Sequence, residues 1–115
     1  MEKKARPQVV PGSTLKILTG CGNLYTTVNY LDGEPIEVFA TLGKAGGCKH
    51  CQLEALSRAV SLGLKYGVPL KEFTDEFIGL SCQRPVIGVS GSCPDALAKA
   101  FKEAERANGR RDSSP

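Results

Sequence analysis

The feature that most constrains the fold of this chain is a change in hydrophobic period at residues 46–47. Before these two glycines, apolar residues alternate with polar ones, which is typical of half-buried strands. After them, apolar residues recur every three or four positions, which is typical of amphipathic helices. Since the chain has only 115 residues, we expect one small domain with a sheet first and helices second.

Three strands are predicted in the N-terminal part. Residues 15–19 alternate at period two and end at the turn sequence Gly-Cys-Gly-Asn over 20–23. Residues 24–31 are rich in Thr, Tyr and Val, which favour strands. Asp32-Gly33 then predicts a tight hairpin of type I′, which returns the chain along the second strand.

The third strand is predicted over residues 36–42. Its apolar residues occupy the even positions, with Glu37 and Thr41 on the opposite face. Pro35 lacks a backbone N–H and therefore places the start of this strand at a sheet edge. The first 42 residues thus predict a three-stranded antiparallel meander.

A long helix is predicted to begin at Cys48 and to end before Gly67 and Pro69. Its core-facing residues share a spacing of three or four: Leu53, Leu56, Val60 and Leu64. A shorter helix is predicted from Pro69 to Gly79. Its buried residues are predicted to be Phe73, Phe77 and Ile78.

Residues 80–92 read as irregular, with a short fourth strand over 86–89 as an optional addition. A last helix is predicted from Pro94, which suits a first helical position, with Asp95 in the first turn. Leu97, Ala98 and Phe101 face inward, and Asn108-Gly109 is predicted to end it. The fold class is therefore α+β, a three-stranded antiparallel meander packed against two to three helices.

Composition and charge indicate the compartment of the protein and the partners that it is expected to bind. No apolar run is long enough to span a bilayer, and the first twelve residues lack the apolar stretch of a secretory signal, so we expect a cytoplasmic protein. Residues 1–6 and 106–115 each carry a net charge of +2, which leaves −1 for the segment between them. A nearly neutral body gives little reason to predict nucleic-acid binding.

Five cysteines in a chain without a secretory signal argue against a disulfide framework. Four of them fall at predicted element ends that the meander brings toward one edge of the sheet: Cys21, Cys48, Cys82 and Cys93. Four thiolates are a sufficient ligand set for a structural zinc ion. Only Cys48 and Cys51 have Cys-x-x-Cys spacing, however, and inert buried thiols are an equal alternative at this point.

Two other uses of this region stay open from the residues alone. Cys48 and Cys93 lie at predicted helix starts, where the helix dipole favours a thiolate suited to thiol–disulfide exchange. The glycine turn before Cys48 offers a weak anion site with Lys44, Gly46 and Gly47 as candidates, although it has neither P-loop nor GxGxxG spacing. No residue is predicted to be catalytic.

Several motifs in order resemble one known family. The runs TLKILTGCGNLYTTVN, EVFATLGKAGGC, QLEALSRAVSLGLKYGV, GLSC and SCPDALAKA are similar to the TSCPD domain. Its Thr-Ser-Cys-Pro-Asp motif is matched here by residues 91–95, which read Gly-Ser-Cys-Pro-Asp. This domain is found near the C-terminus of adenosylcobalamin-dependent (class II) ribonucleotide reductases and in short stand-alone proteins. We expect one such domain over residues 14–108. The Pro and Gly residues over 1–13 predict a flexible lead, and residues 109–115, which have nothing to bury, predict a disordered basic tail.

The resemblance also gives the cysteines unequal weight. The family pattern matches Cys21, Cys48, Cys82 and Cys93, whereas Cys51 stands where the family usually has a small residue. This favours a zinc site made of the four matching cysteines. Cys51 and His50, the single histidine, are spare candidates.

The full-length enzymes of this resemblance have parts that this chain lacks, namely the nucleotide-binding barrel, the cobalamin-binding portion and the C-terminal cysteine pair. We therefore expect an accessory or regulatory module in deoxyribonucleotide synthesis, related by family to ribonucleoside-diphosphate reductase but inactive alone. A class II reductase catalytic subunit would be its partner and would bind the adenosylcobalamin. The alternatives are a thiol–disulfide relay through Cys48 and Cys51 or Cys93, and a nucleotide or nucleic-acid binder that uses Lys44 and the basic tails.

Overall fold

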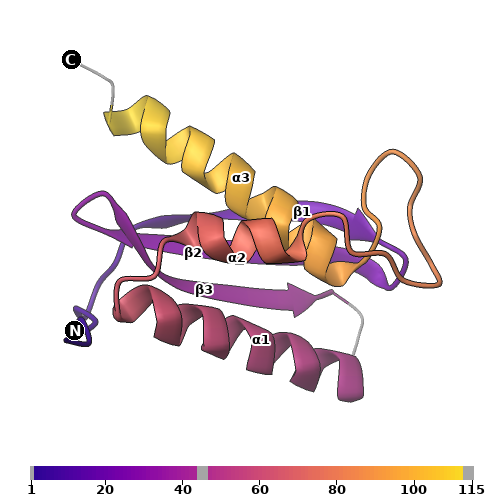
Figure 1. Cartoon of the computed structure of the whole chain (residues 1–115), viewed down its shortest axis with the longest axis horizontal. Coiled ribbons are helices and arrows are strands. Elements are labelled where there is room, and N and C mark those ends of the chain that lie inside the picture. Colours follow the sequence, from indigo (N-terminus) through magenta and orange to yellow (C-terminus); the bar gives the residue numbers. More distant parts are fainter. Residues whose placement is uncertain (1, 44–46, 113–115) are drawn as a thin grey trace.

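The computed structural model describes residues 2–43 and 47–112 and confirms the α+β class. Three antiparallel strands form one sheet in the order β1-β2-β3: β1 (Gly12–Thr19), β2 (Gly22–Leu31) and β3 (Glu34–Leu42). Three helices follow: α1 (Cys48–Lys65), α2 (Leu70–Phe77) and α3 (Cys93–Asp112). Figure 1 shows the helices gathered on one side of the meander, with α1 running alongside β3.

The hairpin between β2 and β3 has the predicted geometry. Asp32 and Gly33 both have positive φ, 53° and 82°, as a type I′ turn requires. Just before this turn, the register of β2 against β3 shifts at a bulge between Asn29 and Tyr30, so that Tyr30 pairs with Pro35. Since β3 is an edge strand, Pro35 removes no ladder hydrogen bond from a central position.

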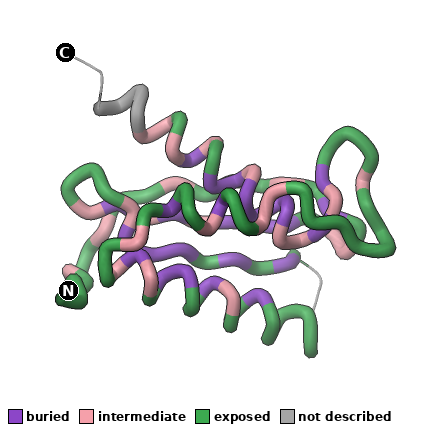
Figure 2. Tube along the Cα trace, viewed as in Figure 1, coloured by how far each residue is buried: buried purple, intermediate pink, exposed green. Residues whose placement is uncertain are grey.

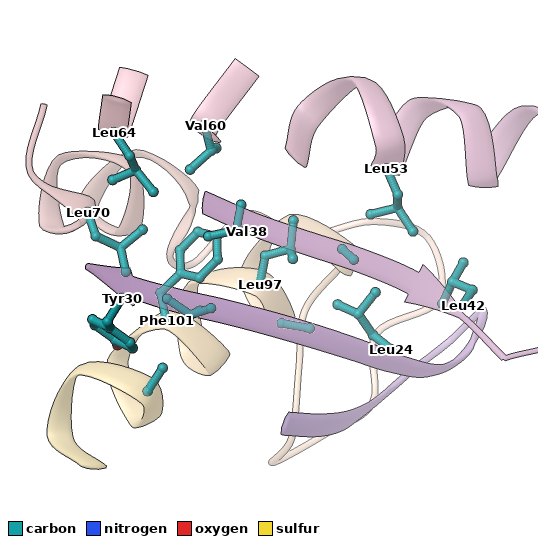
Figure 3. Close-up of a cluster of buried hydrophobic side chains, with 14 residues drawn as sticks. Leu24, Tyr30, Val38, Leu42, Leu53, Val60, Leu64, Leu70, Leu97 and Phe101 are labelled. Atoms are coloured by element: carbon teal, nitrogen blue, oxygen red, sulfur yellow. The ribbon is translucent and has the colours of Figure 1, made fainter. Parts of the chain in front are cut away.

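The core lies between the sheet and the helices. Figure 3 shows Leu24, Val38 and the helical residues Leu97 and Phe101 converging from the sheet and α3. Phe101 and Leu24 are completely buried. Burial of each such side chain stabilises the fold by about 1.5–3 kcal/mol, so this cluster is the main source of cohesion between the layers.

The outer edge of β3 is closed by α1. The Ser61 hydroxyl accepts a hydrogen bond from the Val38 N–H at 2.9 Å and donates one to the Val38 carbonyl at 3.1 Å. A side chain therefore satisfies backbone groups that a further strand would otherwise pair. Covering an edge in this way protects it from pairing with another chain.

One prediction about side-chain placement was wrong. Glu37 was predicted on the solvent-facing side of its strand, yet it is only 3% exposed. The N-terminal segment crosses this part of the sheet, so the Arg6 guanidinium lies 2.8 Å from one Glu37 carboxylate oxygen. The period of a strand gives the face of a residue, but it does not show which distant segment covers that face.

Element boundaries differ in several places. The first strand begins at Gly12, inside the predicted flexible lead, and the second helix ends at Phe77, before Gly79. The last helix begins at Cys93, one residue before Pro94, and continues to Asp112 instead of ending at Asn108-Gly109. Helix propensity disfavours Gly109 by only about 1 kcal/mol, which the following helix formers offset. Over residues 86–89 the structure has an isolated bridge between Val86 and Ser90 and no full strand. The last three residues of the predicted tail, 113–115, lie outside the described part of the chain.

The second helix also buries different residues from those predicted. Leu70 and Thr74 are its buried residues, whereas Phe73, Phe77 and Ile78 are half-buried. Figure 2 shows this mixed exposure along the segment between α1 and the loop before α3. No helix within the described residues is long and apolar enough to cross a membrane.

Candidate metal centre

The four cysteines that match the family pattern lie at element ends, as expected. Cys21 is in the turn between β1 and β2, Cys82 is in the loop after α2, and Cys48 and Cys93 are the first residues of α1 and α3. Cys21 and Cys93 are half-buried, and Cys48 and Cys82 are exposed. All are free thiols.

Three of these thiols come together. Burial is the largest cause of a raised pKa at Cys93, and the neighbouring Cys21 and Cys82 thiols raise it further, whereas a hydrogen bond to Thr19 acts the other way. Cys21 and Cys82 also line one shallow depression at the surface. The structure therefore brings Cys21, Cys82 and Cys93 into one cluster, here called the three-thiol cluster.

Thr19 organises this cluster, and the sequence reasoning did not single it out. Its buried hydroxyl donates to the Gly22 carbonyl at 2.8 Å and accepts from the Cys21 N–H at 3.1 Å. The Cys93 thiol lies 3.8 Å from the same oxygen. A threonine directly before a Gly-Cys-Gly turn is a signal of such local side-chain bonding.

The loop that carries Cys82 is fixed against the β1–β2 turn. A Cβ added at Gly20 would lie 1.9 Å from the Arg84 carbonyl oxygen, so only glycine permits this close approach. The Ser90 hydroxyl donates to the Leu18 carbonyl at 2.7 Å, and the Cys82 N–H donates to the Gly91 carbonyl at 2.9 Å. The position of Cys82 thus depends on contacts far from it in sequence.

The residues around Cys93 in the Ser-Cys-Pro-Asp motif have structural roles. Ser92 is the N-cap of α3, because its hydroxyl accepts from the Asp95 N–H at 3.1 Å. The same hydroxyl donates to the Leu80 carbonyl at 2.7 Å. Ser92 therefore joins the start of α3 to the loop after α2.

Asp95 fastens the two ends of that loop. Its carboxylate accepts from the Gly79 N–H and the Gly91 N–H, each at 2.8 Å, and lies 3.0 Å from the Lys99 ammonium. Burial alone would raise the pKa of Asp95, but these two backbone bonds and Lys99 outweigh it and lower the pKa. The motif therefore holds Cys93 and Cys82 in fixed positions around an ionised carboxylate.

The first turn of α1 reaches the three-thiol cluster through Lys49. Its ammonium lies 3.2 Å from the Cys21 sulfur. Cys48, the neighbouring residue, is an exposed free thiol. The sequence does not single out Lys49, since its pairing with Cys21 depends on how the helix docks.

The spare candidates for metal ligands lie away from the three-thiol cluster, and two of the three candidates for an anion site lie outside the described residues. Cys51 is exposed, and His50 lines a groove between β3 and α1. Gly47 is the N-cap residue of α1, with a φ of 68° and no side-chain cap. Lys44 and Gly46 lie outside the described residues.

The donor set can be compared with the needs of a metal. Across residues 2–43 and 47–112, no three His, Cys, Asp or Glu side chains are arranged to hold a metal ion. The three-thiol cluster and Cys48 nevertheless supply the four sulfur donors that suit zinc. Any fit to zinc therefore lies in the type and number of the sulfur donors and not in their arrangement among the described residues. Cys48 begins the helical turn whose Lys49 touches Cys21.

These features define a small α+β domain with a cysteine cluster where strand turns and helix starts meet. The sequence matches the TSCPD domain family over residues 1–105, and the chain belongs to that family. The expectation from the sequence motifs is confirmed.

Curated relatives carry the same type of segment within much longer chains. A vitamin B12-dependent ribonucleotide reductase of Streptantibioticus cattleyicolor is 37% identical over 79 residues, covering 68% of this chain and 13% of the relative. Proteins of the same name from Streptomyces clavuligerus and Bradyrhizobium diazoefficiens are 37% and 38% identical, covering 68% and 66% of this chain. The chain spans only 8% and 6% of those two relatives. No solved structure gives a significant match.

Proposed function

We propose that this chain is an accessory or regulatory module of a class II ribonucleotide reductase and acts in deoxyribonucleotide synthesis. The observation that carries the proposal is the 37% identity to vitamin B12-dependent ribonucleotide reductases over 79 residues. In those relatives a TSCPD-like segment is part of a far longer chain. The module would supply to a reductase what the relatives have within one polypeptide, while adenosylcobalamin and the reduction of nucleotide belong to the partner.

The module would bind one structural zinc ion through Cys21, Cys48, Cys82 and Cys93. Thr19, Ser92 and Asp95 support this assignment, since each fixes an element that carries one of these cysteines. Zinc would tie the β1–β2 turn, the loop after α2 and the starts of α1 and α3 together. Such a site stabilises a small domain whose own core is modest. Cys51 and His50 would be outside the ligand set.

An activity assay tests the link to the reductase. A class II ribonucleotide reductase from the same organism would be assayed with adenosylcobalamin, with and without an equimolar amount of this chain. We expect a change in turnover of at least about twofold, and a loss of that change with the Cys93→Ser variant, because a loosened cysteine cluster would disturb the docking surface. Cys51→Ser is the matched control and should behave as wild type. The proposal would be contradicted if the chain neither changed the turnover of the reductase nor formed a complex with it.

A further inference from the structure

A groove between β3 and α1 is separate from the cysteines and has the size of a ligand site. Its volume is about 410 Å³, within the range typical of small-molecule pockets. The strand contributes residues 37–41, and the helix contributes residues from His50 to Lys65. In Figure 1 this is the junction between the β3 arrow and the helix that runs beside it.

The floor of the groove excludes an added strand. Ser61 bonds both backbone groups of Val38, so α1 already occupies the edge of β3 at that position. An extended peptide would need that edge for pairing. A ligand in the groove must therefore be compact and lie in front of the strand edge.

Ser57 supplies a polar group that the protein does not use. It lies one helical turn before Ser61, is only 4% exposed, and lines the same groove. Its hydroxyl has no hydrogen-bond partner among the described residues. A buried hydroxyl without a partner is costly, so its retention points to a group that binds it from the groove.

The two walls of the groove present apolar side chains to solvent. Phe39 on β3 is 51% exposed and Leu62 on α1 is 50% exposed, although both are large hydrophobic residues. Both line the groove. An exposed aromatic ring and an exposed aliphatic side chain in one groove offer apolar surface that can bind a flat ring.

The charges of the groove favour an anion. Its two carboxylates are already paired: Glu37 with Arg6 and with Asn29 at 2.7 Å, and Glu54 with Arg58 at 3.1 Å. Lys3 and Lys65 also line it, and Lys65 is close enough to Glu37 to help lower the pKa of that carboxyl. With Arg58, the groove has three cationic side chains against two carboxylates. The Lys4 N–H donates to the Lys65 carbonyl at 2.8 Å, which holds the N-terminal segment at this end of α1.

We propose that this groove binds a nucleoside phosphate. The base would lie between Phe39 and Leu62, a sugar hydroxyl or a base edge would bond Ser57, and the phosphate would lie near Lys3 and Lys65. The site goes beyond the proposed accessory function and uses none of the cysteines.

Calorimetric titration of the full chain tests the site, with ADP and UDP as probes and with adenosine, uridine and inorganic phosphate as partial ligands. We expect at least one diphosphate to bind at least tenfold more tightly than its nucleoside or inorganic phosphate, because only the whole ligand uses both ends of the groove. Ser57→Ala should weaken that binding about fivefold and leave thermal stability unchanged or higher, since it removes a buried hydroxyl without a partner. Lys65→Gln should weaken the binding of the diphosphate and leave the affinity for the nucleoside unchanged.

Ser61→Ala is the matched control, because this serine is bonded to Val38 and its loss should lower thermal stability. Two results would overturn the site: diphosphates that bind no more tightly than inorganic phosphate, or a Ser57→Ala variant with unchanged diphosphate affinity. Zinc content and the effect on a reductase do not enter these readouts, so failure here is distinguishable from failure of the accessory function.

Discussion

Two buried carboxylates, Glu37 and Asp95, show how single residues hold distant segments of this small domain. Each lies on an element of the core and accepts hydrogen bonds from a segment far away or from a loop. In both cases burial opposes ionisation, and hydrogen-bond donors outweigh it so that the pKa is lowered. Ionised carboxylates of this kind stabilise the folded chain only while they remain deprotonated.

For Glu37 this gives a stability prediction with a definite pH dependence. A folded pKa below the ordinary value of 4.5 means that the contribution is present above that pH and is lost as the pH falls through the folded pKa. Glu37→Gln should lower the free energy of unfolding by about 1–3 kcal/mol at neutral pH, and the difference should shrink toward about pH 3. Urea unfolding at a series of pH values measures it.

Glu54→Gln is the control for this measurement, since the Glu54–Arg58 pair is exposed and should contribute less than about 1 kcal/mol. A difference between wild type and Glu37→Gln that stays constant down to pH 3 would show that Glu37 does not act through its charge.

For Asp95 we predict a structural role in presenting the cysteines. Asp95→Asn leaves one acceptor oxygen where two backbone N–H groups and Lys99 need partners, so the free energy of unfolding should fall by about 2 kcal/mol. Alkylation of Cys82 should also become faster, because the loop loses its attachment. Asp75→Asn, on an exposed pair with Lys71, should change neither quantity appreciably.

At the residue scale, sequence reasoning found the cysteines and missed their surroundings. The spacing and the family motifs selected Cys21, Cys48, Cys82 and Cys93. The structure brings all of these together except Cys48. Thr19 and Lys49 contact the same cluster, but a threonine at a strand end and a lysine in a first helical turn are common in other roles. Their roles depend on docking between elements, which local patterns do not encode.

At the element scale, the strands and helices were predictable because each has a strong local signal. The Asp32-Gly33 turn and the alternating apolar residues of β3 define the hairpin without reference to the rest of the chain. The loop over residues 80–92 has no such period. Its path is set by the close approach of Gly20 to Arg84 and by Ser90 on Leu18.

The Gly20 contact gives a prediction about this loop. Gly20→Ala would push a methyl group onto the Arg84 carbonyl, so the loop must move away from the β1–β2 turn. We expect a loss of about 1–3 kcal/mol in stability and weaker zinc binding, because Cys82 moves from Cys21. Zinc affinity by competition with a chromophoric chelator and urea unfolding measure both effects.

Gly43→Ala is the matched control, since its added methyl would meet the Tyr25 ring at an ordinary 3.4 Å. If Gly20→Ala bound zinc as tightly as this control, the packing of the loop would not determine the position of Cys82.

At the scale of the whole molecule, the two regions for which we propose functions lie in different places. The three-thiol cluster lies where the β1–β2 turn meets the start of α3, and the groove lies along β3 and α1. Neighbouring residues of α1 face the two regions, with Lys49 on Cys21 and His50 in the groove. The first turn of α1 therefore connects the two regions.

A metal that joins four separate elements should affect the stability of the entire fold. Since zinc binds the folded chain and a chelator removes it, the melting temperature should fall by at least about 5 °C on addition of a strong zinc chelator, and added zinc should restore it. Cys93→Ser should show the lower melting temperature without chelator, whereas Cys51→Ser should respond as wild type does. A melting temperature indifferent to chelator would count against a structural metal.

The most direct test of the central claim is the metal content of the full chain, purified without chelator and measured by native mass spectrometry together with thiol alkylation. We predict about one zinc ion per chain, with Cys21, Cys48, Cys82 and Cys93 protected and Cys51 reactive until chelator is added. Metal-free protein in which all five thiols react freely would contradict the zinc site and with it the role that we assign to the cysteine cluster.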